Sequence, residues 1–129
     1  MAFMSLSIRS FSQDKALLAR ADSLHQLGRD LFTEQKYEDA IALFEEAAVI
    51  RKEQLGKYVA SYANCLYNIS ISYSQLDDYA HTLEYGLQAL EIREKVLGRE
   101  HPVYARNLYN VAIAYSKMDD YNKALEYHQ

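Results

Sequence analysis

The chain repeats itself with a 42-residue period, and this repeat limits its fold more than any other feature. Tyr37, Tyr79 and Tyr121 stand at equal intervals along the chain. Aligning residues 55–87 with residues 97–129 needs no gap and gives 16 identities in 33 positions. Chance does not produce such an alignment. The sequence therefore predicts an array of similar units, each of which packs mainly on its neighbours.

Composition excludes most other architectures and several functions. The 129 residues include four glycines and one proline, which are too few for the many turns of a β-sandwich or barrel. Half of the residues are apolar, so a core can form. A net charge of −4 argues against a nucleic-acid-binding protein, and a single cysteine excludes an internal disulfide framework. No apolar run reaches the roughly 18 residues that a membrane-spanning helix requires.

Each unit is predicted to contain two helices. In the second unit, Leu66, Ile69 and Tyr73 recur at spacings of three and four, as on one face of an amphipathic helix. Asp77-Asp78 then predicts a turn, because short carboxylates favour turns and helix N-caps. Gly98 is a typical residue at a helix C-terminus. The predicted helix pairs are 16–35 with 37–56, 58–76 with 78–97, and 102–118 with 120–129.

These pairs also predict the organisation of the chain. The last helix lacks a full apolar stripe and a polar cap, so we expect the chain to be the front of a longer protein. Residues 1–13 are apolar in part, and are either an unstructured leader or the remnant of a signal peptide. The compartment therefore stays open between the cytoplasm and an extracytoplasmic location. The predicted segments are a leader at 1–15, units at 16–57 and 58–99, and a shortened third unit at 100–129.

The repeated residues resemble tetratricopeptide repeats, in particular the 42-residue type of kinesin light chains. In the first unit Gly28, Tyr37 and Ala40 stand where that motif places small and aromatic residues. Residues 97–102 resemble the linker between kinesin-light-chain repeats, and the resemblance covers about residues 21–129. It implies an all-α, right-handed superhelical solenoid of antiparallel helix pairs. It also implies a concave groove lined by the first helix of each unit.

If that groove exists, one stripe on each first helix should line it. A column of side-chain amides would then run along the groove, and an amide can pair with both halves of a peptide bond. Two tyrosines beside the column offer flat apolar surface with a polar tip. The candidate peptide-binding residues are Gln26, Arg29, Asn64, Tyr67, Asn68, Ile71, Arg106, Tyr109, Asn110, Ile113 and Lys117.

The predicted groove carries more positive charge than the rest of the chain. Arg29, Arg106 and Lys117, joined by His25 if it is protonated, face only Asp22 as an acidic neighbour. The second helices are rich in glutamate. A basic groove on an acidic protein favours an acidic segment or a free C-terminal carboxylate as its ligand.

Other chemistry is not indicated by the residues. The four histidines share no metal-binding spacing, and no glycine-rich phosphate loop occurs. Cys65 is expected to be a small buried thiol. We therefore expect no enzyme activity, no cofactor and no metal. The repeated aromatic residues are expected to pack between helices, namely Tyr37, Tyr73, Tyr79, Tyr115 and Tyr121.

The favoured function is a non-catalytic protein–protein interaction module, an adaptor or scaffold that holds an extended peptide along its groove. Two alternatives come from other classes of protein. One is the sensor or recognition region of a longer signalling protein or peptidase. The other is a self-assembly module, in which the unfinished third unit associates with another copy.

Overall fold

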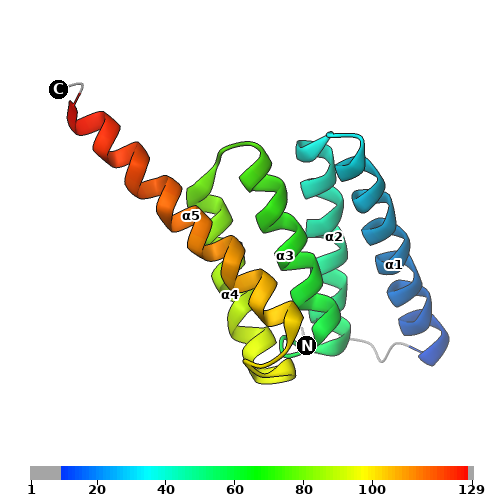
Figure 1. Cartoon of the computed structure of the whole chain (residues 1–129). Coiled ribbons are helices and arrows are strands. Elements are labelled where there is room, and N and C mark those ends of the chain that lie inside the picture. Colours follow the sequence, from blue (N-terminus) through cyan, green and yellow to red (C-terminus); the bar gives the residue numbers. More distant parts are fainter. Residues whose placement is uncertain (1–9, 128–129) are drawn as a thin grey trace, which may run out of the picture.

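The computed structural model describes residues 10–127, and this part of the chain is a row of stacked α-helices (Figure 1). Consecutive helices pack side by side, so that each of α2, α3 and α4 contacts both of its neighbours in the chain. The all-α solenoid and the helix pairs predicted for the first two units are confirmed. The helices of this part of the chain are α1 (Phe11–Thr33), α2 (Tyr37–Leu55), α3 (Ala60–Gln75), α4 (Tyr79–Leu97) and α5 (Pro102–Tyr127).

The same turn joins the two helices of each complete pair. Gln35 and Asp77, which occupy equivalent positions in the repeat, both adopt the left-handed backbone conformation, with φ of 65° and 59°. At the second turn the amide of Asp78 donates to the carbonyl of Tyr73 at 3.0 Å. This is the hydrogen bond of a Schellman motif, which satisfies the last carbonyls of a helix. The repeat is thus one of backbone conformation as well as of sequence.

Small residues allow the helices of a pair to pack closely. A Cβ atom added to Gly28 in α1 would lie 2.7 Å from the ring of Phe44 in α2. Phe44 is fully buried, in a cluster with Ala40, Ile41 and Ile69. The equivalent of Gly28 in α3 is Ser70, whose hydroxyl donates to the carbonyl of Thr82 in α4 at 2.7 Å. A small residue at this position therefore allows the two helices of each pair to pack closely.

The predicted leader at 1–15 is too long. Helix α1 begins at Phe11, because Ser10 and Gln13 form a capping box. The Ser10 hydroxyl accepts from the Gln13 amide at 3.2 Å, and the Gln13 side chain accepts from the Ser10 amide at 2.9 Å. Two N-terminal amides of the helix are satisfied in this way. The predictions for residues 1–9 lie outside the described part of the chain.

The predicted third helix pair, 102–118 with 120–129, is wrong. Residues 102–127 form one continuous helix, α5, which extends away from the other helices at its C-terminal half (Figure 1). Asp119, the counterpart of Asp77, therefore does not make a turn. A left-handed aspartate costs free energy, which in the second pair is offset by the packing of α4 against α3. In the described part of the chain residues 120–127 have no further unit to pack on, so the helix simply continues.

This continuous helix also overturns part of the predicted packing. Tyr115 and Tyr121 were expected between helices but are 53% and 62% exposed. Leu108 is 46% exposed, whereas its counterpart Leu66 in α3 is 3% exposed. The difference arises because, within residues 10–127, α5 has no second helix that folds back over it. The sequence repeat therefore extends to these positions, but their side chains are not buried as they are in the second unit.

Candidate functional site

A recess of about 240 Å³ lies where α1, α3 and α5 meet. We call the side of the array formed by these three helices the groove face. The recess is open to solvent and mainly polar, with an arginine from each of α1, α4 and α5 in its lining. Its lining residues are His25, Arg29, Asn64, Tyr67, Asn68, Arg93, Val103 and Arg106.

A second recess of about 220 Å³ lies next to the first. The two share Arg29 and Asn68, so they follow one another along the groove face. The second recess is more apolar, because Phe32, Phe44 and Ile71 contribute to its walls. Together the two recesses bring together six of the predicted residues, which are Arg29, Asn64, Tyr67, Asn68, Ile71 and Arg106.

The sequence analysis missed two buried arginines that hold successive units together. Arg51 at the end of α2 is 7% exposed, and its Nη2 pairs with Asp22 Oδ1 in α1 at 3.0 Å. Its Nη1 donates to the Ser61 carbonyl at 3.0 Å and to Cys65 Sγ in α3 at 3.2 Å. One guanidinium thus ties α1, α2 and α3 together. The 42-residue repeat could have identified these two arginines, because Arg93 occupies the position in the second unit that Arg51 occupies in the first.

Arg93 repeats this arrangement at the next junction, with one difference in charge. Its Nη2 donates to Asn64 Oδ1 at 3.1 Å and its Nη1 to Asn107 Oδ1 at 3.4 Å. The guanidinium also lies 4.4 Å from the ring centroid of Tyr67, which is a cation–π distance. Asn64 occupies the place that Asp22 holds in the first unit. Arg93 is therefore buried beside a neutral amide, where Arg51 has a carboxylate.

Among the described residues, no carboxylate pairs with Arg93 to compensate its charge. The Nε atom of Arg93 is buried and has no hydrogen-bond partner within this part of the chain. Burial is the main factor that lowers the pKa of Arg93, and the nearby cation Arg106 lowers it further. Arg29 and Arg106 line the same recess. The recess is therefore a site of concentrated positive charge on an acidic protein.

The three side chains of the predicted amide column, Gln26, Asn68 and Asn110, have different partners. Asn68 contacts His25 Nε2 at 3.2 Å, and Asn110 donates to the Ser70 hydroxyl at 2.9 Å. Gln26 is exposed and donates to Asp30 in its own helix at 3.0 Å. Of these three side chains, only Asn68 lines the two recesses.

The remaining predicted residues lie outside both recesses. Tyr109, Ile113 and Lys117 are exposed on α5, further along the helix than Arg106. They line neither recess. Ligand contact at these positions stays a prediction.

His25 is neutral at pH 7, so it does not add to the positive charge of the groove face. Burial, followed by the charges of Arg51 and Arg29, lowers its pKa from 6.5 to about 4. Its Nδ1 lies 3.2 Å from Arg51 Nη1. Arg51 Nη1 and Asn68 Nδ2 can only donate, and Asn68 Nδ2 lies 3.2 Å from His25 Nε2, so a donor faces each nitrogen of the ring. The side-chain oxygen of Asn68 is then left for other partners.

This neutral histidine predicts a loss of stability in mild acid. Between pH 6.5 and about 4 the unfolded chain binds a proton at His25 that the folded chain excludes, so stability falls as the pH falls through this window. Because His25 is only half buried, we expect a discounted loss of about 1–2 kcal/mol. Urea unfolding of the wild type and of His25→Gln, measured at both ends of the window, tests this. The His25→Gln variant should show a pH dependence smaller by that amount, and equal dependences in the two proteins would contradict the assignment.

Other potential sites in the described chain do not resemble catalytic or metal centres. Cys65 is buried, and burial raises the pKa of its thiol, which disfavours the thiolate that a nucleophile needs. Within residues 10–127 no group of three histidine, cysteine or acidic side chains is placed to hold a metal ion. The same residues contain no helix that is long and apolar enough to cross a membrane.

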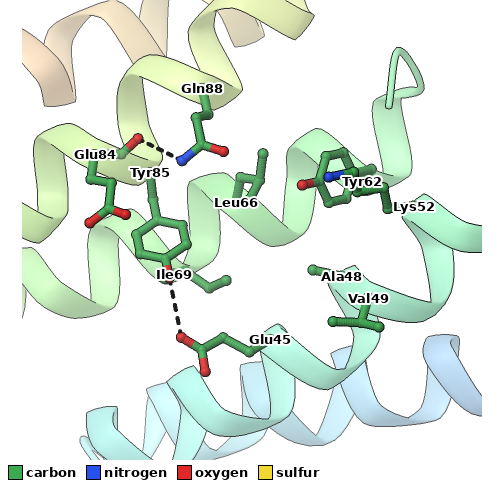
Figure 2. Close-up of a pocket in the computed structure, with 10 residues that line it drawn as sticks. All are labelled: Glu45, Ala48, Val49, Lys52, Tyr62, Leu66, Ile69, Glu84, Tyr85 and Gln88. Atoms are coloured by element: carbon green, nitrogen blue, oxygen red, sulfur yellow. Dashed lines mark hydrogen bonds between the residues drawn. The ribbon is translucent and has the colours of Figure 1, made fainter. Parts of the chain in front are cut away.

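A larger cavity of about 510 Å³ lies between α2 and α4, with α3 as its floor (Figure 2). Leu66 and Ile69 form part of this floor. At one end the Tyr85 hydroxyl donates to Glu45 at 3.4 Å. Burial and the charge of Glu45 are the main causes that raise the pKa of Tyr85 to about 12. The residues that line this cavity are all different from the predicted peptide-binding residues.

Comparisons with known proteins agree with this architecture. A family model described as tetratricopeptide repeat matches residues 19–95 and 82–129. A solved structure described as a kinesin light chain with nearly identical TPR-like repeats, from Podosopora anserina, is similar in fold, with a TM-score of 0.63. It is 23% identical in sequence over 84% of this chain, and the chain spans about half of that structure (51%). A comparison with curated proteins finds no match. The chain belongs to the tetratricopeptide repeat family, and its fold is similar to that of the kinesin-light-chain structure.

Proposed function

We propose that the groove face binds an extended acidic peptide, and that the chain acts through this contact as an adaptor or scaffold. Tetratricopeptide repeats are in general protein–protein interaction modules and are typically non-enzymatic scaffolds. The peptide and its acidic character are the specific part of the proposal.

One observation carries the proposal: Arg93 is buried at a unit junction without the carboxylate that its counterpart Arg51 has. A buried charge without a counter-ion is unfavourable, and an incoming carboxylate relieves this cost. Arg29 and Arg106 add two further cations around the same recess. Charge complementarity of this kind steers an acidic partner and selects against a basic one.

The dimensions of the two recesses favour an extended chain as the ligand. Cavities for whole small molecules usually measure about 300–1,000 Å³, and each recess is smaller than that. Each volume suits one side chain. An extended peptide that places an acidic side chain near Arg93 would place the side chain two residues away in the apolar recess beside Phe32 and Ile71, because successive side chains point to opposite sides. The expected ligand therefore combines an acidic residue with an apolar one.

Asn68 lies between the two recesses and is suited to hold the peptide backbone. Its Nδ2 faces His25 Nε2, so its oxygen remains to accept from a backbone N–H group. Such a contact is independent of the peptide's side chains. Sequence preference would then come from the two recesses on either side.

Fluorescence anisotropy with three labelled synthetic peptides tests the proposal. One peptide carries acidic and apolar residues two positions apart, the second replaces each acidic residue with lysine, and the third replaces each with glutamine. We expect saturable binding of the acidic peptide alone, with affinity that falls as salt is raised, because salt screens exposed charges. Equal binding of the glutamine peptide would contradict the assigned role of the arginines.

A further inference from the structure

The cavity of about 510 Å³ between α2 and α4 is separate from the groove face. Its lining residues come from the two complete helix pairs, and none of them lines either recess of the groove face. Its volume lies within the roughly 300–1,000 Å³ of most ligand-binding cavities. The polar groups at its two ends indicate which ligand it would take.

One end of the cavity is acidic and aromatic. Glu45 and Glu84 lie there on either side of Tyr85 (Figure 2). Burial is the main cause of the raised pKa of Tyr85, and the charges of both glutamates raise it further, so both carboxylates lie near the Tyr85 hydroxyl. Within residues 10–127 neither carboxylate forms an ion pair with a cation. This end of the cavity therefore attracts a positively charged group.

The other end of the cavity holds hydrogen-bond donors. Tyr62 and Lys52 lie there (Figure 2), and Lys52 follows Glu45 by seven residues, which is about 10 Å along α2. Tyr62 is 8% exposed, and its hydroxyl faces the cavity without a hydrogen-bond partner in the described part of the chain. A buried tyrosine hydroxyl usually has such a partner. The Tyr62 hydroxyl is thus available to donate to an acceptor on a ligand.

The surface between these two ends is apolar. Ala48 and Val49 form part of one wall, and Leu66 and Ile69 form part of the floor. A fitting ligand therefore has a cation, an apolar stem and a hydrogen-bond acceptor, in that order. A basic residue of a peptide has these three parts, in its charged head, its aliphatic stem and its backbone carbonyl. Arginine suits the acidic end better than lysine, because its planar guanidinium pairs with carboxylates and stacks on aromatic rings.

We propose that this cavity binds an arginine in a basic segment of a partner protein. The guanidinium lies between Glu45 and Glu84, the aliphatic stem covers Leu66, and the backbone carbonyl accepts from the Tyr62 hydroxyl. Charge complementarity favours this occupant over an acidic one, because two carboxylates and one lysine line the cavity. The groove face and the cavity would then select partner segments of opposite charge.

Fluorescence anisotropy tests the acidic end with a labelled peptide that carries a single arginine between two leucines. A second peptide replaces the arginine with citrulline, which has a similar shape but no charge. We expect saturable binding of the arginine peptide, and binding at least about tenfold weaker when the charged contact is lost, either with citrulline or in the variant Glu45→Gln with Glu84→Gln. No saturable binding of the arginine peptide, or equal binding of the citrulline peptide, would overturn the proposal.

The matched control for this variant is Glu46→Gln with Glu53→Gln. It changes the net charge equally, and both side chains are exposed on α2 and lie outside the cavity. It should change the affinity less than about twofold, because salt screens exposed charges that do not contact the ligand. If both double variants weaken binding equally, the peptide responds to the overall acidity of the protein, and the proposed site is wrong.

Tyr62→Phe tests the other end, because it removes only the hydroxyl. We expect binding of the arginine peptide to weaken about threefold to tenfold, as for the loss of one hydrogen bond, and thermal unfolding to stay unchanged. Tyr104→Phe is the matched control, since Tyr104 is the equivalent residue of α5, is also 8% exposed and lies outside the cavity. Equal affinities of these two variants for the peptide would contradict the assigned role of Tyr62.

Binding of the acidic peptide distinguishes this site from the one proposed on the groove face. The cavity variants Glu45→Gln with Glu84→Gln and Tyr62→Phe should leave the affinity for the acidic peptide unchanged, because their side chains line neither recess. Failure of one site is therefore recognised independently of the other. Loss of acidic-peptide binding in the cavity variants would mean that the two sites are not separate, and would overturn the proposal.

Discussion

Replacing Phe44 with alanine is expected to lower the free energy of unfolding by about 3–5 kcal/mol. Phe44 is fully buried between α1 and α3, and its ring fills the space that Gly28 leaves open. It also packs against His25, with ring centroids 5.3 Å apart. Truncation would remove apolar contacts in two units and leave a cavity that the helix backbones cannot close. This is the largest stability effect that we expect from a single substitution in the chain.

Urea unfolding followed by far-UV circular dichroism measures this effect. Val49→Ala provides the matched control, because Val49 lies in the same helix but is 56% exposed. Its cost should stay within about 0.5 kcal/mol, as is usual for surface substitutions. A Phe44→Ala variant that loses less than about 1 kcal/mol, well below the usual cost of such a truncation, would mean that the contact between the first two units contributes little to the fold.

Reversing the charge of both Arg29 and Arg106 to glutamate should weaken binding of the acidic peptide by at least about 100-fold. Each arginine lines the recess that contains Arg93, so the double change converts a basic site into one that repels a carboxylate. Loss of one partner in a charged contact typically costs about 2–5 kcal/mol when the contact is desolvated. Two such losses together exceed the roughly 2.7 kcal/mol of a 100-fold change, even when partial exposure reduces them.

The matched control reverses two lysines that lie elsewhere. Lys15→Glu with Lys57→Glu gives the same net charge, and both side chains are exposed and line neither recess. This control should change the affinity less than about threefold. If both double variants weaken binding equally, the peptide responds to the overall charge of the protein and not to the recess.

The helix pairs of the first two units were predictable because their signals are local and repeated. Tyr37 and Tyr79 begin α2 and α4, as the 42-residue offset predicted. Apolar spacing also identified the face of α3 that carries Leu66 and Ile69 toward the core. Such patterns depend only on helix geometry, which the sequence displays directly.

The turn in the third unit was not predictable from the same local signal. Asp77-Asp78 and Asp119-Asp120 are identical dipeptides at equivalent positions. The first makes a turn and the second lies inside α5. Tertiary packing decides between these outcomes, because a left-handed aspartate needs a packed second helix to compensate its cost.

The candidate site was predicted only in part, for a related reason. Helical spacing indicates which residues share a face but not which partner each one meets. Asn64 was predicted as a ligand contact, yet its oxygen already accepts from Arg93, which belongs to the next helix of the chain. Arg51 and Arg93 repeat with the correct period, but their burial depends on such distant partners. Comparing the two junctions, Asp22 with Arg51 and Asn64 with Arg93, is what identifies the uncompensated charge.

The central claim is that the ligand lies on the groove face, and residue-specific NMR mapping tests it most directly. The acidic peptide is titrated into the ¹⁵N-labelled protein while backbone and side-chain amide shifts are followed. We predict that the largest changes occur in the segments that line the two recesses, 25–33, 64–71 and 103–106, and include the side-chain amide of Asn68. Changes centred instead on residues 45–52 and 84–88, which line the cavity between α2 and α4, would contradict the account.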